Sequence, residues 1–305
     1  MRDLLVIGGI TGPMRAALEP HFSMVSEAHE GIEYVLTNGH DGIPTSEMDK
    51  MSNLKLISNY GVGYDAIDAG EAAKRGVLVT HTPDVLNAEV ANTTLLLMLA
   101  CYREILRDDA HARSGAWEGG NAPLTRSPEG AKIGILGMGR IGQEIARRLE
   151  IFSPEICYHT RTPKDVPYPH EPNLVEMARK VDCLIVITPG GAATKHLVNR
   201  EVLEALGPQG TVINVARGSV IDEAAMVACL EEGKLGWAGL DVFEAEPKIP
   251  DALKAMPNVV LLPHVGSATV ETRGAMGQLV VDNLIDHLTK GTVRTPVPEC
   301  ASLAG

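Results

Sequence analysis

The stretch Ile135-Leu136-Gly137-Met138-Gly139-Arg140-Ile141-Gly142 decides the fold of this chain. It stands where an apolar run, residues 132–136, gives way to a helical pattern, residues 143–149. In such a strand-turn-helix unit the first glycine permits the tight turn, the second lets the backbone approach phosphates, and the third allows close helix packing. A bound anion then meets the positive end of the helix. The spacing predicts that residues 137–142 bind the pyrophosphate of a dinucleotide.

Short apolar runs alternate with longer amphipathic stretches along the chain, which is the pattern of an α/β protein with parallel sheets. The early runs are residues 4–8, 34–37, 56–59 and 77–80. After a long helical segment, residues 88–111, the later runs are 132–136, 155–159, 183–188, 211–215, 236–240 and 259–262. The six later runs are enough for a complete dinucleotide-binding sheet.

These runs predict two doubly wound parallel-sheet domains with a cleft between them. Residues 99–274 are expected to form a Rossmann dinucleotide-binding domain, and residues 1–98 with 275–305 a smaller flavodoxin-like domain. A helix over residues 282–290 is expected to pack back on the smaller domain.

Composition excludes several classes of protein. The 305 residues carry a formal charge of −12 without a compensating basic run, which argues against a nucleic-acid partner. The five cysteines form no C-x-x-C pair, so we expect reduced thiols, a cytoplasmic setting and no metal site. The apolar runs are too short for a signal peptide or a membrane span.

The segment His159-Thr160-Arg161-Thr162 bears on the choice of cofactor. An NAD site places an acid at the end of the second strand, where it binds the ribose hydroxyls. Here the first acid after the strand is Asp165. Arg161 instead offers the several N–H donors of its guanidinium to a phosphate, and Thr160 and Thr162 offer hydroxyls. The segment predicts an NADP site with NADPH preferred and NAD possible. The alternative is that Arg161 is an ordinary surface cation.

Three further segments follow successive strands of the second sheet: residues 214–218, 241–247 and 263–269. Singly, the arginine, acid and histidine that they carry have ordinary explanations, such as a helix-start cation, a solvated acid or a helix cap. Together they predict a ligand site, because the carboxyl ends of parallel strands share one sheet edge.

With the glycine turn, these segments resemble the D-isomer-specific 2-hydroxyacid dehydrogenases. Residues 59–68 are similar to the substrate-loop signature of that family, and residues 115–117 to the Gly-x-Trp before its cofactor domain. Residues 264–269 with 160–162 most resemble the glyoxylate/hydroxypyruvate reductase branch. The resemblance implies NADPH-dependent reduction of small 2-oxo acids, glyoxylate and hydroxypyruvate, to glycolate and D-glycerate.

The resemblance also implies roles for a catalytic set. Arg217 is expected to hold the substrate carboxylate and the 2-oxygen with two parallel bonds. His264 is the expected proton donor in reduction, and Glu246 is expected to fix its tautomer.

Further contacts are implied by the resemblance. Substrate is expected to touch the backbone N–H groups around Val62 and Gly63 and the side chain of Ser267. For the cofactor, Asp241 is expected to face the nicotinamide, with Val215 and Gly266 along the channel and Thr188 nearer the adenosine. A threonine of Asn92-Thr93-Thr94 also stands near the nicotinamide in the family, and the sequence leaves open which one.

Two other functions and an oligomeric state also have to be considered for this sequence. A reductase of bulkier or aromatic 2-oxo acids remains open, because pocket walls set substrate size. A nucleotide-sensing protein like the related corepressors is disfavoured, since basic patches and long disordered arms are missing from the sequence. The helix from residue 88 past residue 99 is apolar all round, and family members pair through it, so we expect a homodimer.

Overall fold

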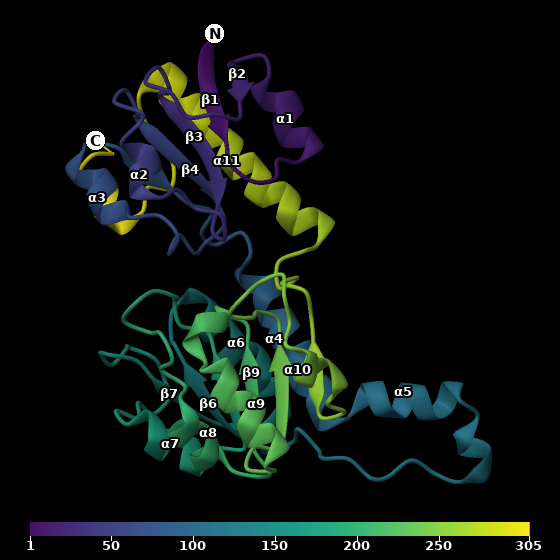
Figure 1. Ribbon diagram of the computed structural model, residues 1–305. Helices are drawn as coiled ribbons and strands as arrows, with labels where there is room; N and C mark the ends of the chain where they lie inside the picture. Colours follow the sequence, from purple (N-terminus) through teal and green to yellow (C-terminus); the bar gives the residue numbers. More distant parts are fainter. Residues whose placement is uncertain (305) are drawn as a thin grey trace. The chain divides into compact units, whose positions relative to one another are not determined.

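The computed structural model describes residues 1–304 and divides into two units (Figure 1). Unit 1 comprises Met1–Leu86 and Thr269–Gly305, and unit 2 comprises Asn87–Ala268. Both units are parallel α/β sheets with helices, as expected. Across the described residues, every helix is too short or too polar to cross a lipid bilayer.

The boundaries between the units lie at 86/87 and 268/269, each a few residues earlier in the sequence than the expected boundaries at 98/99 and 274/275. Helix α4 (Asn87–Tyr102) packs on the sheet of unit 2, where Gly239 brings the backbone close to Leu97 and Cys101. Helix α11 (Val270–Lys290) is continuous from its Thr269 cap and packs on unit 1, so it starts well before the expected helix at 282.

Unit 1 has a five-stranded sheet of order β2-β1-β3-β4-β5. Its strands are β1 (Arg2–Val6), β2 (Phe22–Val25), β3 (Tyr34–Asn38), β4 (Leu56–Tyr60) and β5 (Leu78–Thr80). Its other helices are α1 (Gly12–Leu18), α2 (Thr45–Met48) and α3 (Ala69–Lys74). Strand β2 was not predicted.

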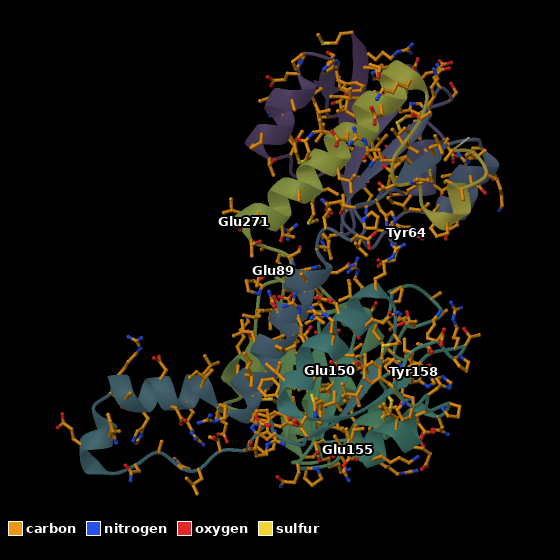
Figure 2. All side chains as sticks on the ribbon, turned by 180° about the vertical axis from the view of Figure 1, so that it is seen from behind. Tyr64, Glu89, Glu150, Glu155, Tyr158 and Glu271 are labelled. Carbon is orange, nitrogen blue, oxygen red and sulfur yellow. The ribbon has the colours of Figure 1, made fainter. Side chains whose placement is uncertain are left out.

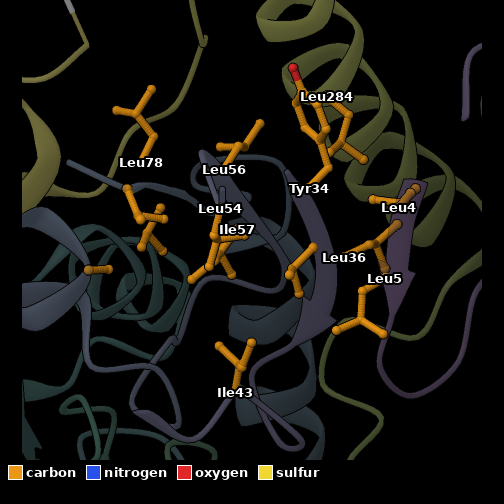
Figure 3. Close-up of a cluster of buried hydrophobic side chains, with 14 of the residues drawn as sticks. Leu4, Leu5, Tyr34, Leu36, Ile43, Leu54, Leu56, Ile57, Leu78 and Leu284 are labelled. Atoms are coloured by element: carbon orange, nitrogen blue, oxygen red, sulfur yellow. The ribbon is translucent and has the colours of Figure 1, made fainter. Parts of the chain in front are cut away.

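The core of unit 1 joins residues from both ends of the sequence. Leu4, Leu36 and Ile57 of the sheet and Leu284 of α11 are all completely buried (Figure 3). Val297 and Cys300, beyond α11, belong to the same cluster. The unit therefore requires both of its chain segments.

Unit 2 has a six-stranded sheet of order β11-β10-β9-β8-β6-β7, all pairs parallel. Its strands are β6 (Lys132–Leu136), β7 (Glu155–His159), β8 (Cys183–Val186), β9 (Thr211–Asn214), β10 (Trp237–Leu240) and β11 (Val259–Leu261). Its longer helices after α4 are α5 (Ile105–Arg113), α6 (Arg140–Leu149), α7 (Leu174–Lys180), α8 (Arg200–Leu206), α9 (Glu223–Glu231) and α10 (Asp251–Ala255). Strand order reverses at β6, the place where dinucleotide folds bind their ligand.

The long helix expected over residues 88–111 is two helices. Glu104 has φ +43°, and this left-handed residue separates α4 from α5. Helix α5 has no buried residue in the described structure and extends away from the sheet of its unit (Figures 1 and 2). The returning chain is anchored by Arg126, whose guanidinium lies 4.4 Å from the ring of Tyr102 and 4.0 Å from that of Trp237.

Candidate active site

The glycine turn has the geometry that its sequence predicts. Gly137 has φ +108°, and a Cβ there would lie 2.8 Å from the carbonyl oxygen of Ile187. A Cβ on Gly142 would collide with the carbonyl oxygen of Gly137, so only glycine lets α6 approach the turn. Within residues 1–304, a Cβ on Gly139 would meet no atom within 4 Å. Open space therefore lies where a phosphate has to approach.

A dinucleotide fits this end of α6. Gly139 is its N-cap and supplies no side-chain acceptor to the first N–H groups, which leaves donors for an anion. Met138, between the first two glycines, is completely buried. Thr188 follows β8 beside Gly137, and Val215, after β9, is buried. The expected cofactor residues thus surround one sheet edge.

The turn after β7 is exposed and carries Arg161. Thr160 Oγ1 donates a hydrogen bond to the carbonyl of Thr162, 2.8 Å away, while Arg161 and Thr162 are exposed. A cavity of about 430 Å³ lies between α6 and the loop that follows this turn. Its lining residues are Arg140, Gln143, Glu144, Arg147, Val166, Pro167 and Tyr168.

His264 and Glu246 form a close pair. Strands β9, β10 and β11 are neighbours, so the loops after them leave the same sheet edge. His264 Nδ1 lies 2.7 Å from Glu246 Oε2, and the other carboxylate oxygen accepts from the N–H of Phe243 at 3.0 Å. Because a carboxylate only accepts, we assign the proton to Nδ1, which leaves Nε2 for proton exchange. The side chain of His264 is 42% exposed and that of Glu246 17%.

The loop bearing His264 is held by Asp241. The Asp241 carbonyl accepts from the N–H of His264, and its carboxylate accepts from Val265 at 2.7 Å and Gly266 at 2.8 Å. These bonds support His264 at φ +54°, a conformation that costs free energy in a non-glycine residue. Burial raises the pKa of Asp241, and the two carboxylate bonds partly counter that shift. Both carboxylate oxygens of Asp241, the residue expected to face the nicotinamide, thus bind the loop that bears His264.

Thr93 holds the same loop from α4. Its Oγ1 donates to the carbonyl of Gly266 at 3.2 Å, whereas Thr94 Oγ1 donates to Val90 within the helix. Of the two threonines between which the sequence did not decide, Thr93 is therefore the one that contacts the expected site.

Arg217 belongs to the loop after β9. Its Nη1 donates to the carbonyl of Ala216 at 2.9 Å, and Asn214 Nδ2 donates to the Arg217 carbonyl at 3.0 Å. The next residue, Gly218, packs so tightly on the backbone of Phe243 that a Cβ would collide with it. The loops that carry Arg217 and Glu246 are thus in direct contact. Ser267 is partly exposed in the adjoining loop.

The loop after β4 in unit 1 presents backbone donors. Asn59 Nδ2 donates to the carbonyls of Gly61 and Gly63, both at 3.0 Å, and His81 Nδ1 lies 3.0 Å from the carbonyl of Val62. In the described part of the chain, the N–H groups of Val62 and Gly63 have no protein acceptor. This loop can therefore bind an anionic oxygen.

Comparison with known proteins gives the family of the chain. Residues 95–266 match the model of the D-isomer specific 2-hydroxyacid dehydrogenase, NAD binding domain. The chain belongs to this family. It is 44% identical to glyoxylate/hydroxypyruvate reductase A of Arabidopsis thaliana, over 93% of this chain and 91% of that protein. It is also 44% identical to hydroxyphenylpyruvate reductase of Plectranthus scutellarioides, over 88% and 86%.

A solved structure extends the comparison to the whole dehydrogenase. The NADPH-dependent glyoxylate/hydroxypyruvate reductase of Sinorhizobium meliloti, in complex with NADP and malonate, is 45% identical with a TM-score of 0.92. The match covers 98% of this chain and 97% of that one. The dehydrogenase is thus an oxidoreductase with a nicotinamide dinucleotide cofactor, and the family resemblance stated from the sequence is confirmed.

Sequence reasoning assigned no role to two residues that hold the loop after β4 of this dehydrogenase. Asn59 and His81 fix the carbonyls of residues 61–63. Asn59 lies inside the quoted substrate-loop motif and could have been found there. His81 acts from 19 residues away and carries no local signal.

Replacing Asp241 by asparagine is expected to lower kcat roughly ten- to a hundredfold. The asparagine NH₂ group would be a donor facing the backbone N–H of Val265 or Gly266, which is also a donor. That N–H would lose its acceptor, at a cost of about 1–3 kcal/mol. Initial rates and thermal unfolding check this. Thr93→Val, which removes one weaker bond to the same loop, is the matched control and should cost less than the asparagine variant. Equal effects would contradict the role given to Asp241.

Proposed function

We propose that the dehydrogenase is an NADPH-preferring reductase of small 2-oxo acids, glyoxylate and hydroxypyruvate, giving glycolate and D-glycerate. The observation that carries this is the 2.7 Å pair of His264 and Glu246. Glu246 lies on the loop after β10, which contacts the loop bearing Arg217, and His264 lies on the loop after β11. These loops leave the sheet edge that holds the glycine turn. The Arabidopsis thaliana and Sinorhizobium meliloti relatives, both named for these two substrates, support the assignment.

The roles proposed for the catalytic residues follow from their chemistry. Bound NADPH supplies the hydride that reaches C2 of the substrate. Arg217 holds the carboxylate and polarises the 2-oxygen with two parallel N–H donors. His264 donates the proton from Nε2 to the developing alkoxide, while Glu246 keeps Nδ1 protonated and the ring oriented. In oxidation, His264 accepts the same proton.

Unit 1 is proposed to contribute to carboxylate binding. The N–H groups of Val62 and Gly63 are donors without protein acceptors in residues 1–304, and glycine at position 63 carries no side chain that could block an anion. Ser267 is proposed as a further substrate contact, because it follows His264 on the same loop.

Replacing Arg161 by alanine is expected to raise KM for NADPH by about tenfold or more and to leave KM for NADH nearly unchanged. Only NADPH carries the 2′-phosphate that the exposed guanidinium is proposed to bind, and a charge-assisted bond of this kind contributes about 1.5–3 kcal/mol. Steady-state kinetics with both cofactors measures the effect. A proportional rise for both would place the 2′-phosphate elsewhere.

Substrate size is tested by initial rates with glyoxylate, hydroxypyruvate, pyruvate and phenylpyruvate, each with NADPH and NADH. The proposal predicts the highest kcat/KM with glyoxylate or hydroxypyruvate and NADPH. The relative named hydroxyphenylpyruvate reductase favours the second candidate, a reductase of aromatic 2-oxo acids. A preference for phenylpyruvate would establish that candidate instead.

A homodimer is proposed through an apolar arm surface, defined as the exposed side chains of Leu96, Ile105, Leu106, Trp117 and Leu124. Leu97 and Met98, also in the apolar run of α4, are buried in their own unit, so they do not contribute. Four of these side chains lie on α5 or on the chain that returns from it, and Leu96 lies on α4. Exposed large apolar side chains of this kind are typical of a surface covered by a partner.

The dimer is tested with Leu106→Glu, which places a charge on the arm surface. Light scattering is expected to give twice the 32.5 kDa chain mass for the wild type and the single-chain mass for the variant. Val270→Glu, an equally drastic change of an exposed side chain outside the arm, should leave the mass unchanged. A monomeric wild type would refute the proposal.

A reducing, cytoplasmic setting is also proposed. All five cysteines are free, and four of them are buried. Burial raises the pKa of Cys101 to about 12, which keeps that thiol protonated and unreactive.

A further inference from the structure

The proline-rich loop over residues 163–172 folds back on the edge strand β7. The N–H of Tyr158 donates to the carbonyl of Pro169 at 3.0 Å, and the N–H of Glu171 donates to the carbonyl of Tyr158 at 2.8 Å. Tyr158, labelled in Figure 2, thereby pairs in parallel with His170. The end of the loop extends the sheet beyond β7 and places His170 beside the turn that carries Arg161.

His170 is fixed on three sides. Its Nε2 lies 2.9 Å from the carbonyl oxygen of Thr160. Its ring contacts the buried ring of Tyr158, with 5.1 Å between centroids, and stacks on His159 at 6.3 Å and 12°. His159 is held in turn by Glu171, whose carbonyl lies 2.8 Å from His159 Nδ1. Since a carbonyl only accepts, Nε2 of His170 carries a proton and donates it.

The hydrogen bond from His170 to the Thr160 carbonyl orders the turn of residues 160–162. The Thr160 carbonyl belongs to the same planar peptide as the N–H of Arg161, so holding the oxygen fixes the orientation from which the Arg161 side chain departs. The Thr160 hydroxyl fixes the other end by donating to Thr162. These two bonds order a turn whose next two residues, Arg161 and Thr162, are exposed.

We propose that His170 is a specificity-determining positioning residue: it holds the turn of residues 160–162 in the shape that receives the 2′-phosphate of NADPH. This inference rests on the NADP site proposed above and adds a residue that touches neither cofactor nor substrate. Its contribution is preorganisation, because a turn that is already ordered loses less conformational freedom on binding. The effect is confined to the cofactor that bears the phosphate.

The test compares KM for NADPH and for NADH in three variants. His170→Phe keeps a ring against Tyr158 but loses the donor, and His170→Asn is too short to reach Thr160. Both are expected to raise KM for NADPH about three- to tenfold, the range for one neutral hydrogen bond, with KM for NADH and kcat unchanged. His170→Gln can place an amide N–H near the position of Nε2 and is expected to restore much of the NADPH affinity.

A matched control and a double variant sharpen the result. Tyr168→Phe removes another side-chain bond of the same loop, 2.7 Å to Glu150, and should leave the cofactor ratio unchanged. In the Arg161→Ala background, His170→Phe should have little further effect on KM for NADPH, because both residues act through one turn. Thermal unfolding of every variant reports whether the loop merely contributes to stability.

The outcomes separate the two proposals. If Arg161→Ala changes the NADPH-to-NADH ratio but His170→Phe and His170→Asn do not, the role of His170 is refuted and the site stands. Equal losses for both cofactors, no rescue by glutamine, or full additivity with Arg161→Ala refute it as well. If Arg161→Ala leaves the ratio unchanged, the proposed 2′-phosphate site fails, and the role of His170 fails with it.

Discussion

Replacing His264 by alanine is expected to lower kcat by about 10²- to 10⁴-fold, the usual contribution of a positioned general acid. The variant loses the proton donor and leaves the Glu246 carboxylate without its imidazole partner. Cofactor affinity is expected to remain near the wild-type value, since the glycine turn lies on other loops. Stopped-flow or steady-state rates with glyoxylate and NADPH, beside a direct titration of NADPH, measure the two effects separately.

A suitable control for this variant is His29→Ala. His29 is an exposed histidine 3.3 Å from the carboxylate of Asp3, far along the sequence from the candidate site. Its removal should change kcat less than about twofold, as is usual for an exposed pair. A His264→Ala enzyme that kept most of its activity would require a different proton donor and would overturn the proposed mechanism.

The second large effect is expected for Arg217→Lys, although the charge is kept. A lysine ammonium is a point charge that cannot make two parallel bonds to a carboxylate and a 2-oxygen. Loss of one charge-assisted bond, about 1.5–3 kcal/mol, corresponds to a fall in kcat/KM of roughly ten- to 150-fold. Kinetics with hydroxypyruvate as the varied substrate provide the measurement.

Arg200→Lys is the matched control for this change. Arg200 is a partly exposed arginine of α8 that pairs with Glu204 and Glu232. Its conservative replacement should leave kcat/KM within about twofold, because exposed pairs contribute little. If Arg217→Lys behaved in the same way, a single charge would be sufficient and the two-bond model of carboxylate recognition would be wrong.

The sequence predicted the sheet of unit 2 because its signals are local. Each strand from β6 to β11 lies within one of the short, mostly apolar runs of the sequence, and the spacing of Gly137, Gly139 and Gly142 specifies the turn between β6 and α6. In unit 1, β2 escaped prediction because it is a four-residue edge strand in which only Phe22 is buried. The break at Glu104 also escaped, since a single left-handed residue without glycine leaves no pattern.

The sequence predicted the reacting side chains of the candidate site better than the hydrogen bonds that hold their loops. His264, Glu246 and Arg217 follow strands, so topology alone brings their loops to one edge. The contacts of Asp241, Thr93 and His170 join residues 24, 173 and 10 positions apart. Such contacts are decided by how loops pack, which is information that periodicity and motif spacing do not contain.

The discontinuity of unit 1 has a consequence for biosynthesis. The ribosome makes residues 1–86 before residues 87–268, yet the core that residues 1–86 build also needs Val280, Leu284 and Val297, which follow both segments. The contiguous segment 87–268 can complete its own sheet before those residues emerge. We therefore expect unit 2 to fold before unit 1 during synthesis. The apolar strands of residues 1–86 then stay uncovered until α11 and the segment after it have been made.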